Sequence, residues 1–587
     1  MSGDSRQMEA IFIESIPQIK IKEILLKLVD SRVLILFVMP LALYIALSHF
    51  MPLIEPDESR YFEISDNMVD SCDYVMPRLA GVIYLEKPPL SYWASALIFK
   101  LFGENDFTTR LYIGVCAWAC LLLVYFMGSF LHDRNTGLYA AGVLGTSLFF
   151  FIFGNFNLLD IPLTFYTCLA VWAGYRHVTG ALDKKAWLYF LYLSSALAFL
   201  TKGLIGVVFP FAILTLWLVL SGHWKRTVEL FSPVGIVLFL AITSPWIILV
   251  QQQHKDFLRF FFIQEHFLRY TTTMHGRDHA LLLYVPVVII GCLPWTAFLV
   301  RAAWEVRKEK GSASALRGKS FLWTWIVFIF VFFSLSSSKL IPYIAQIFIP
   351  LSVLIGNVLK NYDFLSPLPQ KRFQSFLLQL PIFLQSLLFI ALLLLPMFFH
   401  QGSRFGGDLS IMHSRQWVWL IILPIFSQMM LAFLPNMVKK IYHRGWFVTI
   451  YILSGLFLIS ILPSASAFLT PYKSSYPVSQ AIKMLIPADR EVYQYKILLY
   501  GIATYNEIRT PLVGDFGELS YGMKFLTPEE RDHYFLSVEQ FKVRVDQEGI
   551  IYCLTEYKDH FDELKNMFPN LEVLWSNGAY YLMKLKR

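Results

Sequence analysis

Apolar runs about 20 residues long recur along most of this chain, and they limit its fold more than any other feature. An α-helix needs about 20 residues to cross the ~30 Å hydrocarbon core of a bilayer. Of the 587 residues, 56% are hydrophobic and only 16% are charged, which is unlike an ordinary soluble protein. The sequence therefore predicts a polytopic α-helical membrane protein whose surface contacts membrane lipids.

Polar residues, glycines and prolines divide the apolar runs into about thirteen predicted transmembrane helices. The predicted spans lie near 32–51, 111–131, 137–153, 157–175, 187–200, 203–221, 230–250, 281–301, 321–336, 341–358, 374–399, 416–434 and 445–463. An odd number of spans puts the two ends of the chain on opposite sides of the membrane.

Lys and Arg residues favour the loops on one side of the predicted bundle. Cytoplasmic loops carry such an excess, so the N-terminus is predicted to be cytoplasmic. The loops 51–110 and 251–280 and the C-terminal domain then lie on the outer side. Most of the excess comes from the loop 301–320 and the pairs Lys184/Lys185, Lys225/Arg226 and Lys439/Lys440.

Three regions follow from the change in composition along the chain. Residues 1–31 resemble an interfacial amphipathic segment, 32–463 form the transmembrane domain, and 464–587 have the composition of a soluble domain. In the last region, predicted strands alternate with helices expected at 480–487, 527–546 and 558–567, which indicates a small α/β domain. The expected strands are "EVYQYKI", "TPLVGDF", "IIYCLTE" and "LEVLWSNGAYYLMKL".

Composition argues against two other classes of function. The net charge of +8 is modest and unevenly placed, so nucleic-acid binding is not indicated. The six cysteines show no metal-ligand spacing, and Cys72 and Cys553 are expected to be unpaired thiols.

Ionisable residues from separate segments gather on the predicted outer face. The densest group is "EPDESRYFEI" at residues 55–64, directly after the first span. Ionisable groups near hydrocarbon are costly and indicate a functional site. The gathered residues are Asp57, Glu58, Arg60, Glu86, Lys87, Asp160, Lys202, His266, Arg269, His275, Arg277, Asp278, Lys339 and Tyr343.

Simpler structural roles also fit several of these residues. Glu55, Glu58 and Glu63 are typical of a solvated acidic surface, and Asp57 and Arg60 have the spacing of an i,i+3 ion pair. Lys202 has the position of a snorkelling lysine.

Asp160 is the residue for which a purely structural role fits least well. It lies among apolar residues in "FNLLDIPLTF", where a carboxylate needs a partner. Acids and cations that face outward at the lipid boundary suit a sugar donor anchored by a lipid phosphate, because cations stabilise the leaving phosphate and a carboxylate orients or deprotonates the acceptor. This pattern predicts a glycosyltransferase.

Eight segments resemble, in order, the motifs of the ArnT-like lipid A 4-amino-4-deoxy-L-arabinose transferases. These are integral-membrane glycosyltransferases of the GT-C fold, related to the protein O-mannosyltransferases. The resemblance covers about residues 50–350. The segments are "EPDESRYFEI", "MPRLAGVIYLEKPPLSYW", "FNLLDIPLTF", "LAFLTKGLIGVVFP", "SPWIILV", "FFIQEHFLRYTTTMHGRDH", "GCLPW" and "SLSSSKLIPYIA".

The resemblance implies a reaction and a location. Such enzymes take a sugar from a polyprenyl-phosphate donor, invert the anomeric carbon and act at the periplasmic face of the bacterial inner membrane. The implied acceptor is a lipid A phosphate or another periplasmic acceptor, and no cofactor is required.

The family motifs fall on named residues of this chain. The carboxylates of Asp57 and Asp160 are the implied catalytic groups. Glu86 and His266 take positions that can face one another, so a divalent metal ion fits there without being required. The implied donor-phosphate and substrate-binding residues are Arg60, Tyr84, Lys87, Lys202, Arg269, Lys339 and Tyr343.

The chain departs from the family pattern at Cys72, Asp73, Tyr74, Ala80 and Ile341. These positions are expected to flank the donor pocket, so they bear on the identity of the sugar. Two other acceptor classes stay open, that of a protein O-mannosyltransferase and that of a hexosyltransferase of the lipopolysaccharide core. A lipid-linked sugar transporter is less well supported, because the charges lie at one end of the spans and no matching halves are visible.

Overall fold

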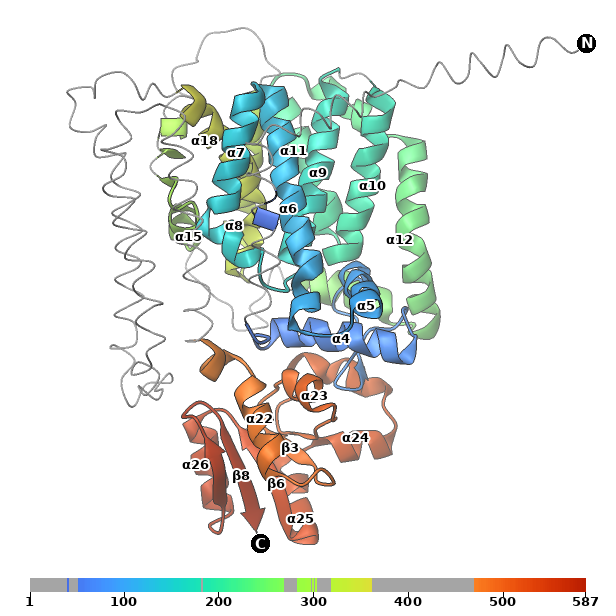
Figure 1. The fold of residues 1–587 in the computed structure, drawn as a ribbon. Helices are drawn as coiled ribbons and strands as arrows, with labels where there is room; N and C mark the ends of the chain where they lie inside the picture. Colours follow the sequence, from blue (N-terminus) through green and yellow to red (C-terminus); the bar gives the residue numbers. More distant parts are fainter. Residues whose placement is uncertain are drawn as a thin grey trace, which may run out of the picture.

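The structure is a computed structural model that describes residues 38, 40, 41, 51–180, 183–268, 282–296, 298–299, 301–303, 318–361 and 469–586. These residues form a helical bundle and a C-terminal α/β domain, with a layer of two helices between them (Figure 1).

The bundle consists of α-helices joined by short turns. Side chains start several of them: Asn105 accepts hydrogen bonds from the Phe107 and Thr108 backbone N–H groups before α6, and Asp133 accepts one from Thr136 before α7. The helices are α6 (Asp106–Leu131), α7 (Arg134–Thr146), α8 (Leu148–Phe153), α9 (Asp160–Val178), α10 (Lys184–Lys202), α11 (Ile205–Leu220), α12 (Pro233–Gln253), α15 (Tyr284–Gly291), α17 (Gly318–Leu335) and α18 (Phe348–Asn361). Shorter helical elements are the 3-10 helices η1 (Trp224–Leu230) and η3 (Ile341–Ile347), α13 (Phe257–Arg259) and the π-helix η2 (Phe260–Leu268).

The predicted spans from 111–131 to 341–358 all fall on these helices. The span predicted at 137–153 is divided at Ser147, where α7 ends and α8 begins. Four described helices are long and apolar enough to cross a membrane: 106–131, 233–253, 318–335 and 341–360. The spans predicted at 374–399, 416–434 and 445–463, and most of 32–51, lie outside the described residues.

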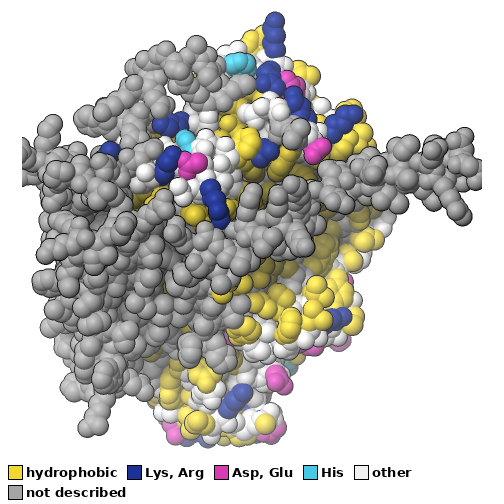
Figure 2. All heavy atoms as spheres, turned by 45° about the horizontal axis from the view of Figure 1, so that its top comes forward, with side chains coloured by type: hydrophobic (Ala, Val, Ile, Leu, Met, Phe, Trp, Pro, Cys, Tyr) yellow, Lys and Arg dark blue, Asp and Glu magenta, His cyan; other side chains and the backbone are white. Residues whose placement is uncertain are grey.

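The surface of the bundle has a basic end and an apolar flank. Figure 2 turns the end opposite the C-terminal domain toward the viewer, and Lys and Arg side chains gather there above a flank of hydrophobic side chains. On α12, Val234, Val237 and Leu240 are 60%, 66% and 50% exposed. Such a continuous apolar flank is what contact with lipid requires.

The predicted outer loop 51–110 is folded into a compact layer. It contains α4 (Asp57–Ser71), a hairpin of β1 (Arg78–Leu79) and β2 (Val82–Ile83), and α5 (Leu90–Phe102). Helix α4 lies across the end of the bundle that faces the C-terminal domain (Figure 1).

A buried ion pair between Glu58 and Arg110 joins α4 to α6. The Arg110 guanidinium donates to both carboxylate oxygens of Glu58, at 2.8 and 2.6 Å, and to the backbone carbonyl of Pro52 at 3.1 Å. Glu58 also accepts a hydrogen bond from the backbone N–H of Asn157, at 2.7 Å, in the turn before α9. This pair therefore fixes α4 relative to α6 and to the start of α9.

The C-terminal domain is built on a six-stranded sheet with the strand order β5-β4-β3-β6-β8-β7. Strands β3 to β6 pair in parallel, while β8 is antiparallel to both β6 and β7. The strands are β3 (Val492–Tyr495), β4 (Leu512–Val513), β5 (Phe535–Leu536), β6 (Ile550–Thr555), β7 (Glu572–Ser576) and β8 (Tyr581–Lys586). The helical elements are α22 (Tyr476–Leu485), α23 (Gly501–Asn506), η5 (Gly517–Ser520), η6 (Gly522–Phe525), α24 (Pro528–Tyr534), α25 (Val538–Glu548) and α26 (Lys558–Met567).

Most predicted elements of this domain are confirmed, with several differences, among them that β5 was not predicted and that the segment 571–585 contains two strands, β7 and β8. The helix predicted at 527–546 is two helices, α24 and α25, because β5 between them pairs with β4. The helix α23 was not predicted. The thiols of Cys72 and Cys553 are both free, and Cys553 is buried.

Removing Arg110 should destabilise the fold strongly, because it leaves the Glu58 carboxylate buried and without its counter-charge. We expect Arg110→Met to lower the free energy of unfolding by about 3–5 kcal/mol. The double variant Glu58→Gln/Arg110→Met should lose less, since no buried charge remains. Chemical unfolding in detergent micelles measures both, and equal losses in the two variants would contradict the role given to this pair.

Candidate active site

A cavity of about 460 Å³ lies at the end of the bundle that faces α4. Five of the residues predicted from the sequence line it: Glu86, Lys87, Asp160, Lys202 and Tyr343. Apolar side chains make up much of the remaining wall. They include Leu204, Val208, Phe209, Phe262, Ile263, Phe267, Phe332 and Phe333.

Asp160 and Lys202 form an ion pair in this cavity. Asp160 is the first residue of α9 and Lys202 the last residue of α10, and the Lys202 Nζ lies 2.6 Å from a carboxylate oxygen of Asp160. Each charge suits its helix terminus, because a helix favours anions at its N-terminus and cations at its C-terminus. The Lys202 Nζ also lies 4.8 Å from the centre of the Tyr343 ring. Asp160 therefore has the partner that its apolar surroundings required.

Lys87 lies between two carboxylates on a second wall of the cavity. Its Nζ is 3.5 Å from an oxygen of Glu86 and 3.3 Å from an oxygen of Glu265, which comes from η2. Glu265 was not among the predicted site residues, although the segment "QEHF" that contains it was. The family resemblance pointed to its neighbour His266 instead.

Arg60 forms the centre of an adjoining network outside the cavity lining. Its buried guanidinium pairs with Asp57 on the same helix and with Glu518 from the C-terminal domain. It also donates to the Tyr84 hydroxyl at 3.3 Å, and that hydroxyl lies 3.2 Å from an oxygen of Glu86. The network thus reaches the cavity through Tyr84 and Glu86.

Glu518 is a site residue that the sequence did not reveal. Its second oxygen accepts a hydrogen bond of 2.6 Å from the Tyr500 hydroxyl, so the C-terminal domain holds the carboxylate in place. Arg60 and Glu518 are 458 positions apart in the sequence. No local signal marks Glu518, which lies in a short segment of the soluble domain.

Asp57 and Asp160 belong to neighbouring groups. Asp57 is half-exposed and does not line the cavity, whereas Asp160 does. Burial raises the pKa of the Tyr61 hydroxyl, and the Asp57 and Asp160 carboxylates both raise it further. Tyr61 therefore lies within electrostatic range of both acids, at the boundary between the network and the cavity.

The acids expected to be solvated are buried instead. Glu55, Glu58 and Glu63 are 9%, 2% and 8% exposed. Glu55 accepts hydrogen bonds from the backbone N–H groups of Tyr500 and Gly501, at 3.3 and 2.7 Å, so it docks the C-terminal domain onto α4. The predicted surface role was wrong because the C-terminal domain covers Glu55, Arg110 of α6 pairs with Glu58, and the hairpin packs on Glu63.

The remaining predicted site residues are Lys339, Arg269 and His266. Lys339 is buried between α17 and η3 and is absent from the cavity lining, which includes Ser336 and Ser338, so its role in donor binding stays a prediction. Arg269 and the side chain of His266 lie outside the described residues. The metal site at Glu86 and His266 therefore stays a prediction.

The positions at which the chain departs from the family pattern do not themselves line the cavity. Cys72, Asp73, Tyr74, Ala80 and Ile341 are all absent from its lining. Ala80 has a positive φ of 49° at the tip of the hairpin, where its backbone N–H donates to Glu63. Their expected bearing on the identity of the sugar stays a prediction.

An apolar helical bundle with a charged cavity under a separate α/β domain is the architecture of the GT-C glycosyltransferases. A solved structure of this class superimposes on nearly the whole chain: ArnT from Cupriavidus metallidurans bound to undecaprenyl phosphate. The TM-score is 0.80 at 21% sequence identity, covering 95% of this chain and 98% of that one. The chain has the GT-C fold, which confirms the resemblance seen in its motifs.

Sequence comparisons agree with the fold. Residues 86–249 match the model of the dolichyl-phosphate-mannose-protein mannosyltransferase family. Two curated relatives are the undecaprenyl phosphate-alpha-4-amino-4-deoxy-L-arabinose arabinosyl transferase 1 of Proteus mirabilis, 31% identical, and its counterpart in Erwinia tasmaniensis, 30% identical. Each match spans 328 residues, which is 54% of this chain and 58% of the relative. The chain therefore matches somewhat more than half the length of these relatives.

Docking of the C-terminal domain through Glu55 should depend on pH. Burial raises the pKa of Glu55 to about 7 from 4.5, so the folded protein holds this proton more tightly than the unfolded chain does. The stability contributed by protonated Glu55 is present below about pH 4.5 and is lost as the pH rises toward 7.

Thermal unfolding in detergent between pH 5 and pH 8.5 tests this expectation. The Tm of the unmodified protein should fall with rising pH, and Glu55→Gln, which has no proton to lose, should show a shallower fall. Parallel slopes for the two proteins would contradict the assignment.

Proposed function

We propose that this protein is an inverting glycosyltransferase that moves a sugar from a polyprenyl-phosphate donor to an acceptor at the periplasmic face of the inner membrane. The transfer best supported is that of 4-amino-4-deoxy-L-arabinose, or a related sugar, to a lipid A phosphate. The observation that carries this proposal is the cavity itself, in which charged pairs from four separate segments meet a wall of apolar side chains.

The cavity suits a lipid phosphate because it offers both kinds of contact. Lys202 holds one carboxylate, and because a lysine ammonium has three N–H donors, it retains donors for a phosphate oxygen, while Lys87 between Glu86 and Glu265 adds a second positive charge. Phe262, Ile263 and Phe332 provide apolar surface for the first isoprene units of the lipid. The solved relative with this fold was determined with undecaprenyl phosphate bound.

The proposed reaction is a single displacement at the anomeric carbon. An acceptor oxygen forms the new bond to that carbon while the bond to the polyprenyl phosphate breaks, and the phosphate leaves with the electron pair. Lys87 and Lys202 stabilise the charge that develops on the leaving phosphate. The configuration inverts because attack and departure occur on opposite faces of the sugar.

Whether the reaction needs a general base depends on the acceptor. A lipid A phosphate is already ionised near neutral pH, so Asp57 and Asp160 would position the reactants and need remove no proton. A hydroxyl acceptor would need one of these carboxylates to take its proton. Arg60, held by Asp57 and Glu518, would orient the reacting groups from the edge of the cavity.

An amino sugar fits the charge of the site better than a neutral sugar does. Asp160, Glu86 and Glu265 place carboxylates around the two lysines, and a protonated sugar amine needs such a counter-charge. The names of the curated relatives specify an aminoarabinose donor. Together these observations support 4-amino-4-deoxy-L-arabinose as the transferred group.

The orientation proposed for the chain rests on its surface charge. The end of the bundle that carries the Lys and Arg cluster would face the cytoplasm, which places the cavity, α4 and the C-terminal domain in the periplasm (Figure 2). We also propose the region boundaries 1–31, 32–463 and 464–587, with about thirteen spans in the middle region. The described helices and the C-terminal sheet support this division.

Substitution of Asp57 tests the reaction. We expect Asp57→Asn to lower kcat by about 10²–10⁴-fold, because it removes a carboxylate that orients Arg60 and the acceptor. Since the Asp57 side chain is half-exposed, the Tm of the variant should differ little from that of the unmodified protein. The assay measures transfer from undecaprenyl phosphate-aminoarabinose to lipid A by purified protein, with the surface variant Asp546→Asn as a control. Undiminished transfer by Asp57→Asn would refute its role.

The same assay separates the acceptor classes. The match of residues 86–249 to the mannosyltransferase family favours a protein acceptor as the second candidate. Transfer to a serine-containing peptide from a mannosyl-phosphate lipid, with none to lipid A, would replace the proposed acceptor and leave the reaction type intact. Transfer to neither acceptor would count against both candidates.

Glu518 should act as a positioning residue through Arg60. We expect Glu518→Gln to lower kcat by roughly 10–100-fold with an unchanged Tm, because small displacements of an orienting group slow a reaction strongly. The double variant Arg60→Gln/Glu518→Gln should be no slower than Arg60→Gln alone, since the carboxylate acts only on the guanidinium. Independent, multiplying losses in the two variants would contradict this coupling.

A further inference from the structure

A second cleft, of about 640 Å³, lies between α4 and the C-terminal domain. It is separate from the cavity described above, and the two share no lining residue. One face of α4 contributes Glu63, Asp66 and Asp70, and the turn between α5 and α6 contributes Glu104. The spacing of three, four and seven positions along α4 puts its three acids on the same side of the helix.

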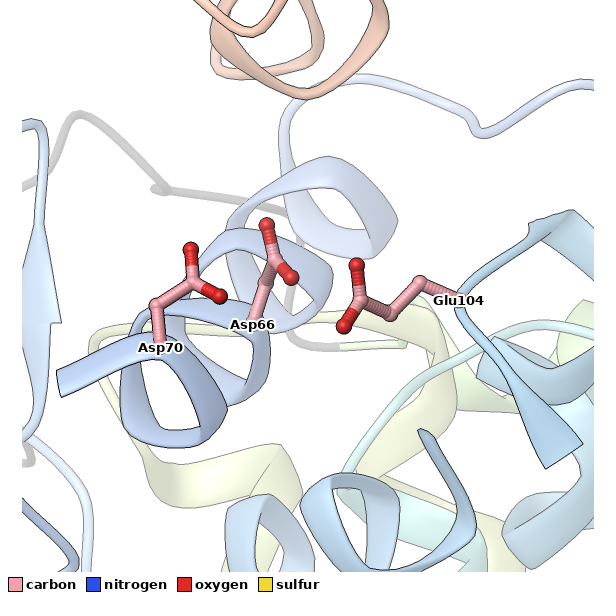
Figure 3. Close-up of side chains that lie close together, drawn as sticks. All are labelled: Asp66, Asp70 and Glu104. Carbon is pink, nitrogen blue, oxygen red and sulfur yellow. The ribbon is translucent and has the colours of Figure 1, made fainter. Parts of the chain in front are cut away.

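Three of these carboxylates converge. Oxygen atoms of Asp66, Asp70 and Glu104 all lie within 4.8 Å of one another. Figure 3 shows the three side chains turned toward one another, two from successive turns of α4 and one from the neighbouring turn between α5 and α6. A cation held by oxygen ligands at 2.3–2.6 Å spans such a separation, as Ca²⁺ does in proteins.

Glu63 adds an independent sign that a ligand belongs here. Its side chain is only 8% exposed, and one oxygen accepts a hydrogen bond of 2.7 Å from the backbone N–H of Ala80. The other oxygen, Oε2, is buried and has no hydrogen-bond partner among the described residues. Since buried carboxylate oxygens are otherwise satisfied in nearly all proteins, this oxygen requires a proton or a cation.

The electrostatic balance of the cleft is negative. Glu507 adds a fifth carboxylate to its lining, whereas Arg509 is the one Lys or Arg among the described lining residues. The Arg509 guanidinium is stacked 3.7 Å from the centre of the Tyr534 ring, on its side of the cleft. Without a counter-ion, these acids repel one another.

We propose that Asp66, Asp70 and Glu104 bind a divalent cation, Ca²⁺ or Mg²⁺, in the cleft that Glu63 also lines. Carboxylates without His or Cys ligands select these hard cations over zinc or copper. The cleft has room for the water molecules that such ions retain. The ion ties α4 to the turn between α5 and α6, and so holds the helix that begins with Asp57 and Arg60. Binding at this site does not depend on the glycosyltransferase activity.

Binding of Ca²⁺ or Mg²⁺ to the full-length protein in detergent tests the proposal directly. With a dissociation constant near 1 mM, as is typical of exposed extracellular sites, 10 mM cation shifts the folding equilibrium about 11-fold. We expect either cation to raise the Tm of the EDTA-treated protein and calorimetry to detect binding of one ion per chain. Asp66→Asn/Glu104→Gln should lose both effects and should be at least as stable as the unmodified protein in EDTA, because the repulsion is relieved.

The experiment includes a control variant and a substitute for the cleft variant. Asp546→Asn/Asp562→Asn removes the same charge from the outer helices α25 and α26, and it should respond to the cations as the unmodified protein does. If Asp66→Asn/Glu104→Gln does not fold, the exposed Asp70→Asn takes its place and should weaken binding several-fold. No rise in Tm at 20 mM of either cation, or an equal rise in the cleft variant and the control, would overturn the proposal. A protein that binds the cation but transfers no sugar would contradict the proposed function and leave the cation site in place.

Discussion

The buried pair of Glu58 and Arg110 is the interaction on which the rest of the site depends. An arginine and a carboxylate in bidentate contact, with backbone groups satisfying their remaining bonds, fix both distance and angle between the elements they join. Here those elements are α4, α6 and the turn before Asp160. Because α4 also presents Asp57 and Arg60, one buried pair sets the position of the network relative to the cavity.

The C-terminal domain is part of the site as well as a cover for it. Glu518 pairs with the Arg60 guanidinium. On the membrane side, Glu55 accepts hydrogen bonds from two backbone N–H groups of the C-terminal domain. The membrane part thus presents two buried ionisable side chains, Arg60 and Glu55, whose partners come from the C-terminal domain. Separating the halves would leave Arg60 and Glu55 without these partners, a cost that explains why the acidic segment after the first span is buried and not solvated.

The cavity combines two environments that a lipid-linked substrate needs together. Its ion pairs, Asp160 with Lys202 and Lys87 with Glu86 and Glu265, keep four segments at one level of the bundle. Its remaining wall is apolar. Pairing lowers the cost of placing these charges beside hydrocarbon, and Lys202, which holds a single carboxylate, still has N–H donors for an anion. The acidic cleft between α4 and the C-terminal domain is more negative, since its described lining has five carboxylates and one arginine, against three carboxylates and two lysines in the cavity.

The sequence alone determined the membrane class, most helix positions and five residues of the cavity lining, because apolar periodicity and charges set in apolar surroundings are local signals. It also indicated that Asp160 needs a partner. Only the tertiary structure identified that partner as Lys202 and brought Glu265 and Glu518 to the site. It likewise showed that Glu63 is buried and that Lys339 lies outside the cavity lining. The physical reason is that residues 42 to 458 positions apart meet only when helices pack and a second domain docks, and neither event leaves a pattern in the local sequence.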